Sequence, residues 1–237
     1  MKRSEVRHRV QNISLGFIAG YVDTLGFVAL FGLFIGHITG NFVLIGAELS
    51  GPQEGPILLK FLAFPSFILG VAFARITIGA LLKRGHHALV YAYCLQLLLL
   101  VGFMLSGVLS PPLAHDPNLM SAITGSIGAW AMGTHSCTSR LLLPSFAPTT
   151  MMTGNVTQLT IDAVDVLRGG ADETTKKRCV KFLWPVVAFG VGGIGAGFAY
   201  IYAGFYALLI PIAILFYLIH TERGAMRKKE HLSNAAT

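Results

Sequence analysis

The chain has 237 residues, of which 54% are hydrophobic and only 12% are charged, and its mean hydropathy is +0.65. These values lie outside the range of soluble domains of this length, so they exclude a water-soluble globular protein and predict an integral membrane protein. The formal net charge of +7 is attributed to basic loops that face anionic lipid. Membrane lipid is therefore an expected partner, and nothing requires nucleic acid.

Apolar stretches recur along the chain at lengths that suit a bilayer. The longest, residues 182–219, has 38 residues without one Asp, Glu, Lys, Arg or His. As a single helix it would be about 57 Å long, nearly twice a hydrocarbon core of roughly 30 Å, so it should fold back near residues 202–206. Turns rich in glycine and proline, at 51–56 and 110–117, separate other such stretches. The predicted crossings are residues 13–35, 57–82, 87–109, 118–142, 180–201 and 204–221.

These six crossings predict an all-α, polytopic membrane helix bundle, and the basic residues predict its orientation. Lysine and arginine concentrate in alternate hydrophilic segments and are absent from the segments between them. The basic segments are residues 2–9, 83–84, 168–181 and 223–229. Because basic residues stay on the cytoplasmic side of short loops, both termini are expected in the cytoplasm. The three cysteines lack metal-site or redox spacing, so no metal or other cofactor is predicted.

A triplet in the first half of the chain returns in the second half. Thr39-Gly40-Asn41 is repeated as Thr153-Gly154-Asn155, 114 residues later. Farther along, Lys60-Phe61-Leu62 followed by Gly70 resembles Lys181-Phe182-Leu183 followed by Gly190. The sequence therefore predicts an internal repeat.

The repeat divides a single integral membrane domain, residues 1–237, into halves at about 10–110 and 117–222. Each half would contribute three crossings. Because three is an odd number, the second half must enter the membrane from the opposite side. This predicts a 3+3 inverted repeat, an arrangement found in many secondary transporters.

Each triplet precedes a short apolar stretch, residues 42–49 and 156–166, that is too short to cross a bilayer. We interpret these stretches as half-helices whose N-termini carry partial positive charge and approach the membrane midplane from opposite sides. The Thr and Asn residues would cap free amides, and the glycines would adopt backbone geometry closed to other residues. The predicted substrate-binding residues, suited to an anion or the carboxylate of a zwitterion, are Thr39, Gly40, Asn41, Thr153, Gly154, Asn155, Asp23 and His135. The alternative is that each triplet is a turn before a short helix at the membrane surface, and the sequence leaves both interpretations open.

Charged and histidine residues inside the crossings are candidates for coupling. Asp23 lies within the first predicted crossing, where an ionised carboxylate is costly without a partner, and Arg75 in the second is the expected counter-charge. Asp23 would bind a proton or couple to substrate, or else form a structural pair with Arg75. His37 and His135 could relay protons, although a hydrogen-bonded structural histidine is the commoner case.

Small residues four positions apart, such as Gly16 with Gly20 and Gly193 with Gly197, predict close helix packing. Such faces would also serve a homodimer, which one sequence leaves open.

The set of motifs resembles a known family. Ala19-Gly20-Tyr21-Val22-Asp23, then Ile38-Thr39-Gly40-Asn41 and later Met152-Thr153-Gly154-Asn155, is similar to the YoaK-type family of bacterial inner-membrane proteins, a domain of unknown function. The resemblance covers residues 13–220. It implies one polytopic domain, a bacterial origin and a location in the cytoplasmic (inner) membrane, and it names no substrate.

The leading functional prediction is a secondary transporter or exporter of a small organic solute, with an anionic solute and proton coupling through Asp23 as its specific form. The alternatives are a membrane channel, which also uses paired half-helices, and a membrane scaffold that does not transport. A membrane-embedded enzyme is disfavoured, because the sequence has no HExxH, GxSxG or nucleotide-binding glycine motif.

Overall fold

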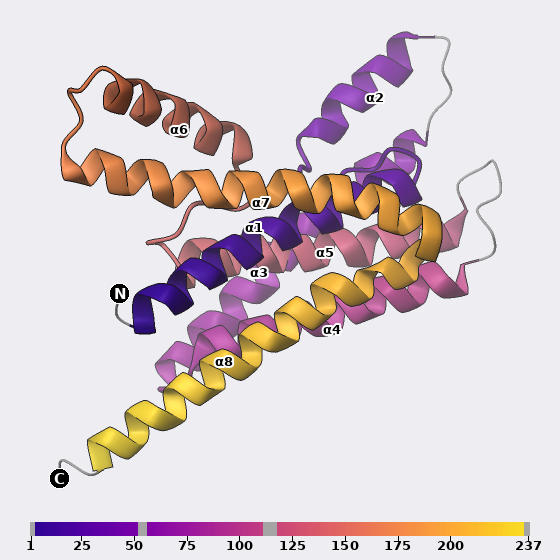
Figure 1. Cartoon of the computed structure of the whole chain (residues 1–237). Helices are drawn as coiled ribbons and strands as arrows, with labels where there is room; N and C mark the ends of the chain where they lie inside the picture. Colours follow the sequence, from indigo (N-terminus) through magenta and orange to yellow (C-terminus); the bar gives the residue numbers. More distant parts are fainter. Residues whose placement is uncertain (1–2, 52–55, 111–117, 235–237) are drawn as a thin grey trace.

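The computed structural model describes residues 3–51, 56–110 and 118–234, which form helices joined by turns (Figure 1). Six helices are long and two, α2 and α6, are short. The elements are α1 (Arg3–Ala29), α2 (Gly40–Ser50), α3 (Ile57–Lys83), α4 (Ala88–Leu109), α5 (Leu119–Leu142), α6 (Met152–Leu167), α7 (Glu173–Ala203), the 3-10 helix η1 (Gly204–Leu208) and α8 (Leu209–Asn234). The predicted turns at 51–56 and 110–117 lie mostly outside the described residues.

The all-α prediction is confirmed. The helix α7 begins at Glu173 rather than near residue 180, α8 ends at Asn234 rather than near residue 221, and a predicted crossing is cut short at the end of α1. This helix ends at Ala29 rather than near residue 35, because Phe31 and Gly32 have φ values of 54° and 75° and cannot continue a right-handed helix. The predicted fold-back lies at Gly204, which has a φ of 53° and ends α7. η1 then turns the chain into α8.

Four segments of the described chain are long and apolar enough to cross a membrane: Glu5–Ala29, Ile57–Lys83, Ala88–Leu109 and Glu173–Lys228, the last of which contains α7, η1 and most of α8. The helix α5 is not among them, since small polar residues such as Thr124, Thr134 and Ser139 occur along it. These side chains are buried, and α5 packs against both α3 and α4. Its polar residues therefore face protein.

Two pairs of helices make the closest contacts in the bundle, α1 with α7 and α3 with α5. In each pair, glycines let one backbone lie directly on the carbonyl groups of the other. A Cβ atom at Gly20 would overlap the carbonyl oxygen of Phe189, and one at Gly192 would overlap that of Phe17. Together these contacts bring the backbones of α1 and α7 together from both sides.

The α3–α5 pair has the same design. A Cβ atom at Gly133 would overlap the carbonyl oxygen of Phe67, and one at Gly70 would overlap that of Trp130. The two α5 residues, Gly133 and Trp130, each follow their α1 counterparts, Gly20 and Phe17, by 113 residues. The two α7 residues, Gly192 and Phe189, each follow their α3 counterparts, Gly70 and Phe67, by 122 residues. Each of the two contacts between α1 and α7 therefore has a counterpart between α5 and α3. By its contacts, the counterpart of Gly70 is Gly192. The sequence comparison predicts Gly190 instead, but no atom lies within 4 Å of a Cβ at Gly190.

The short helices are each tied to the following long helix by an ion pair. Glu48, near the end of α2, pairs with the Lys60 ammonium group of α3. Asp162, near the end of α6, accepts three hydrogen bonds from the Arg178 guanidinium of α7, the two shortest at 2.7 and 2.8 Å. The guanidinium holds the pKa of Asp162 below its usual range. Asp162 follows Glu48 by 114 residues, the spacing of the two triplets.

We expect Gly20→Ala and Gly133→Ala each to lower the melting temperature of the detergent-purified protein clearly, because the added methyl group forces the paired backbones apart. Gly195→Ala is the control, since nothing lies within 4 Å of a Cβ at that site and alanine favours the helix by roughly 1 kcal/mol. Scanning fluorimetry measures both effects. A melting temperature unchanged in Gly20→Ala would contradict the close packing described here.

Glu48→Gln should destabilise the protein by about 3 kcal/mol, because it leaves the buried Lys60 ammonium group without its counter-charge. Asp162→Asn should destabilise the protein less, because the Arg178 guanidinium that loses its counter-charge is 46% exposed. The control is Glu173→Gln, which breaks the exposed pair with Lys176 and should change the melting temperature little. Equal effects of Glu48→Gln and Glu173→Gln would show that the buried pair is not important.

Candidate functional site

The carboxylate of Asp23 organises the turn that leads from α1 to α2. Asp23 is 4% exposed, and its Oδ1 atom accepts hydrogen bonds from the backbone amides of Ile35, Gly36 and His37 at 2.9, 2.6 and 3.3 Å. Its Oδ2 atom lies 2.6 Å from Nδ1 of His37. Three amides and an imidazole therefore stabilise a charged carboxylate without a second helix supplying a cation.

The predicted pair between Asp23 and Arg75 is not formed. Arg75 is exposed on α3, whereas the ion-pair partner of Asp23 in the described chain is His37. The pairing follows from the turn after α1, which reverses the chain and returns residues 35–37 to the end of the helix that carries Asp23.

Asn41 fixes the start of α2 by bonding backwards. Its Nδ2 atom donates to the carbonyl of Phe34 at 2.7 Å, and its Oδ1 atom accepts from the amide of Phe34 at 3.0 Å. No side chain caps α2, so the predicted capping by Thr39 or Asn41 is wrong; the first amides instead bond to carbonyls three residues earlier. Gly40 has no positive φ, and its space is limited by the ring of Phe34.

The second triplet repeats part of this arrangement. Asn155 donates from Nδ2 to the carbonyl of Pro148 at 2.7 Å, seven residues back, as Asn41 does to Phe34. Thr153 and Gly154 lie exposed in the first turn of α6, Gly154 has no positive φ, and no side chain caps this helix. The capping predicted for Thr153 or Asn155 is therefore also wrong.

The hydroxyl of Ser136 lies 3.1 Å from that of Thr150, 14 residues later. In the first half, Asp23 and His37 are also 14 residues apart, and Ser136 follows Asp23 by 113 residues. The position of the ionisable pair in the first half is thus taken by two hydroxyl groups in the second.

His135 is 1% exposed and joins three segments. Its Nδ1 atom lies 2.9 Å from Nε2 of Gln96 on α4, and its Nε2 atom lies 2.7 Å from Oγ1 of Thr149. The Nε2 atom of Gln96 can only donate, so Nδ1 of His135 accepts from it; in the neutral ring the proton then lies on Nε2, which donates to Thr149. These contacts are those of a neutral histidine with a structural role. Its partners were not predictable from the sequence, because Gln96 is 39 residues and Thr149 is 14 residues away along the chain.

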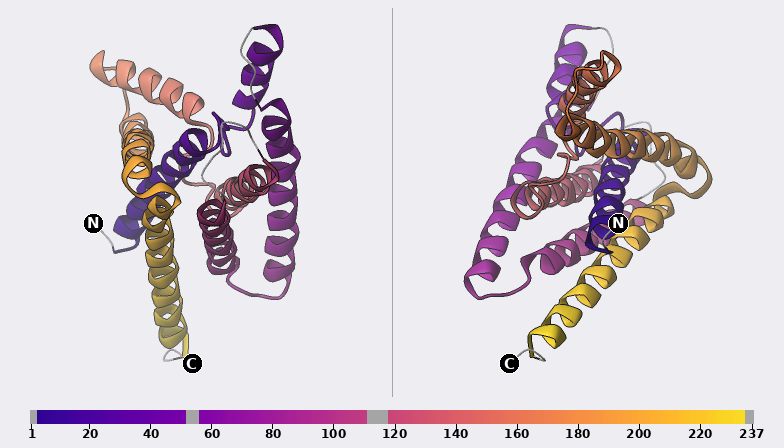
Figure 2. Two further views of the ribbon diagram at one scale, coloured as in Figure 1. Left: turned by 90° about the vertical axis from the view of Figure 1, so that its right-hand side faces the viewer. Right: turned by 60° about the vertical axis from the view of Figure 1, so that its left-hand side comes forward.

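Both polar clusters lie halfway along the long helices. The ring of His37 is 5.4 Å from that of Phe189, one residue from the midpoint of α7, and Gln96 lies within three residues of the midpoint of α4. The N-terminal ends of α2 and α6 lie near each other, and the two helices diverge from there (Figures 1 and 2). The side chain of His37 is 34% exposed, and Thr39, Thr153 and Gly154 are also exposed near these ends.

The structure therefore places some of the predicted substrate-binding residues in the protein interior and others at its surface. Asp23, Asn41, Asn155 and His135 are buried and hydrogen-bonded within the protein, where they fix the broken segments. Those free to meet a solute are Thr39, Thr153 and Gly154, with His37 beside them. Within the described ranges, no group of three or more His, Cys, Asp or Glu residues could hold a metal ion.

An all-α protein with several helices apolar enough to cross a membrane, and with a polar cluster at each of two broken segments, defines a polytopic membrane-type helix bundle. Residues 11–221 match the family described as a protein of unknown function (DUF1275), and the chain belongs to this family. This agrees with the resemblance to YoaK-type proteins. No curated protein and no solved structure matched the chain.

Asn41→Ala should destabilise the protein by about 1–3 kcal/mol, because it leaves the amide and carbonyl of Phe34 without partners. Thr39→Ala is the matched control two residues away, since Thr39 is exposed and makes no capping bond. Thermal unfolding of both variants tests the distinction. If Thr39→Ala is the more damaging change, Asn41 does not fix the start of α2.

Proposed function

We propose that the protein is a secondary transporter of a small organic, anionic solute, built from six membrane crossings as a 3+3 inverted repeat. The observation that carries the proposal is the Asp23–His37 pair, which lies at the tip of a half-helix, halfway along α7, with one third of the imidazole side chain exposed.

The matched contacts support the repeat. The glycine–carbonyl contacts of α1 with α7 correspond to those of α5 with α3, and the Asn41 contact corresponds to that of Asn155. The acidic residues Glu48 and Asp162 correspond as well. Correspondence of contacts is stronger support than the few identities in sequence, because each contact requires two segments to match.

Helix directions support six crossings. Contacts between α1 and α7 rise together in residue number, from Gly16 with Pro185 to Gly20 with Phe189, so these helices run parallel. Contacts between α4 and α5 run in opposite order, with Gln96 beside His135 and Gly102 beside Ile127. Six alternating crossings, with α1 and α7 entering from one side, give these relations. We count α5 as a crossing because its polar side chains face protein.

The distribution of charge supports the proposed orientation in a bacterial cytoplasmic membrane. Both termini lie at one end of the bundle, where the basic segments at 83–84 and 168–181 also lie (Figure 1). By the rule for basic residues, this end faces the cytoplasm.

We assign the proton-binding role to His37 and a positioning role to Asp23. The carboxylate accepts hydrogen bonds from three backbone amides, whereas the imidazole, bonded to Asp23 through Nδ1, is 34% exposed and would exchange the proton. A protonated His37 next to the free tips of α2 and α6 would favour an anion there, and the neutral ring would release it. Proton binding and anion binding would thus be coupled through one side chain.

The proposal predicts saturable solute uptake into proteoliposomes that responds to a pH gradient. The solutes are chosen by thermal-shift screening of small carboxylates, amino acids and phosphate esters. In His37→Gln we expect exchange of labelled for unlabelled solute to persist, while accumulation driven by the pH gradient is lost. Lys176→Gln is the control, because this exposed residue lies away from the proposed site.

A flux that does not saturate would indicate a channel, and the absence of flux for every stabilising solute would indicate a scaffold. Gradient-driven accumulation that survives in His37→Gln would remove the coupling role of this residue.

A further inference from the structure

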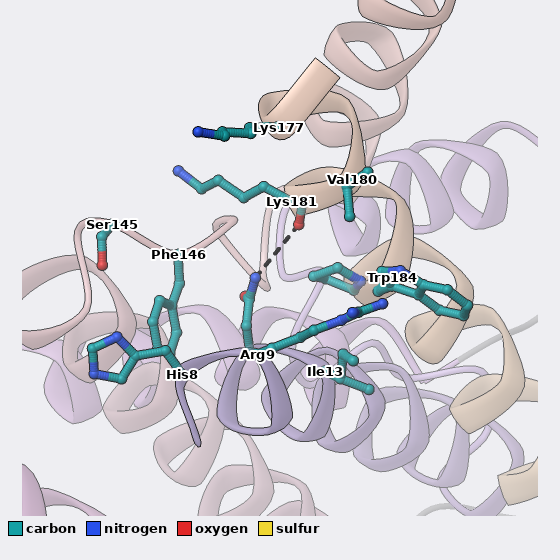
Figure 3. A pocket seen from close by; sticks show the side chains of 11 residues that line it. His8, Arg9, Ile13, Ser145, Phe146, Lys177, Val180, Lys181 and Trp184 are labelled. Atoms are coloured by element: carbon teal, nitrogen blue, oxygen red, sulfur yellow. Dashed lines mark hydrogen bonds between the residues drawn. The ribbon is translucent and has the colours of Figure 1, made fainter. Parts of the chain in front are cut away.

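A cavity of about 320 Å³ lies between the first turns of α1, the first turns of α7 and the segment that joins α5 to α6 (Figure 3). It is at the end of the bundle where both termini lie, and neither Asp23 nor His37 lines it. The residues that line it are His8, Arg9, Asn12, Ile13, Ser145, Phe146, Lys177, Val180, Lys181, Trp184 and Pro185.

The lining of the cavity is strongly cationic. Arg9, Lys177 and Lys181 contribute three positive charges, and none of the described lining residues is acidic. Lys177 and Lys181 extend in the same direction from α7, toward the segment that carries Ser145 and Phe146 (Figure 3). Like charges placed together repel one another, so an anion between them would stabilise the arrangement.

A buried polar atom in the cavity has no partner. Asn12 is 8% exposed; its Nδ2 atom donates to the carbonyl of Lys181 at 3.4 Å, which leaves Oδ1 as an acceptor without a hydrogen bond. An unpaired buried acceptor calls for a donor such as a hydroxyl group. A ligand that carries both an anionic group and a hydroxyl donor would satisfy the lysines and Asn12 together.

The remaining walls suit the part of a lipid that joins headgroup to acyl chains. Ile13, Val180 and Trp184 supply apolar surface, and the Arg9 guanidinium lies 5.3 Å above the Trp184 ring. Tryptophan with lysine and arginine is the usual composition of a membrane interface, and basic pockets between helix ends bind anionic headgroups.

We propose that this cavity binds the phosphate of an anionic phospholipid headgroup, with a headgroup hydroxyl donating to Oδ1 of Asn12. The phosphate lies between Lys177, Lys181 and Arg9. The inference rests on the proposed membrane orientation and is independent of transport. It adds a consequence for the fold: a bound lipid touches the segment that positions Thr149 and Thr150, and so supports the start of α6.

The test uses the full-length protein, delipidated in detergent, and measures melting temperature during titration with phosphatidylglycerol. Phosphatidylcholine and soluble glycerol phosphate are the comparison ligands. We expect phosphatidylglycerol to raise the melting temperature with saturation and the other two to have little effect. Lys177→Gln with Lys181→Gln should weaken the response about fivefold per lysine. Lys176→Gln, which removes a neighbouring charge outside the cavity, should respond as the wild type does.

A second measurement, native mass spectrometry of co-purified lipid, reports binding even where a variant is unstable. We expect retained phosphatidylglycerol in the wild type and in Lys176→Gln, and its loss in the double variant. Equal stabilisation by phosphatidylcholine, or equal retention in the double variant, would overturn the site. Stabilisation by glycerol phosphate without a lipid effect would show a site for a free anion and overturn the lipid assignment. Either result leaves the transport test unaffected.

Discussion

The structure depends on how the backbone amides of the turn at residues 30–39 obtain hydrogen-bond partners within an otherwise apolar helix bundle. Unpaired amides are costly away from water, and in the turn after α1 the amides of residues 34–37 have side-chain acceptors rather than backbone carbonyls. Asp23 resolves this by accepting three amide hydrogen bonds with one carboxylate oxygen, and Asn41 closes the same turn by bonding both backbone groups of Phe34. The start of α2, its direction and the exposed position of His37 all follow from these two side chains.

The close contact of α1 with α7 and of α3 with α5 sets the frame around this turn. Because the glycines allow carbonyl groups to lie directly on the opposing helix, the two pairs have little freedom to slide. The short helices are held differently, by an ion pair at one end and by a backward asparagine bond at the other. The fold therefore combines two closely packed helix pairs with two short helices at the periphery: among the described helices α2 packs on α3 alone, and α6 packs on α7 alone.

The sequence was informative where the signal was local. Long uncharged runs predicted the long helices, the excessive length of the run at 182–219 predicted the reversal before α8, and the apolar stretches after the two triplets predicted the short helices. The partner of Asp23 was not predictable in the same way, since it depends on the positive φ values of Phe31 and Gly32. The sequence predicts that Asn41 and Asn155 cap the helices that they begin. Each instead bonds to a carbonyl seven residues earlier in the chain, and this contact depends on the path of the preceding turn. The sequence does contain a signal for the ion pairs of Glu48 and Asp162, since each acid follows the Asn of its Thr-Gly-Asn triplet by seven residues.

The two halves match in packing but differ in chemistry at one position. Where the first half has Asp23 with His37, the second has Ser136 with Thr150, and hydroxyl groups do not ionise near neutral pH. A transporter built this way would have an ionisable pair at this position in one half only. The exchange of Ser136 and Thr150 for an acid and a histidine would then be the route by which a relative of this protein acquired a second coupled proton.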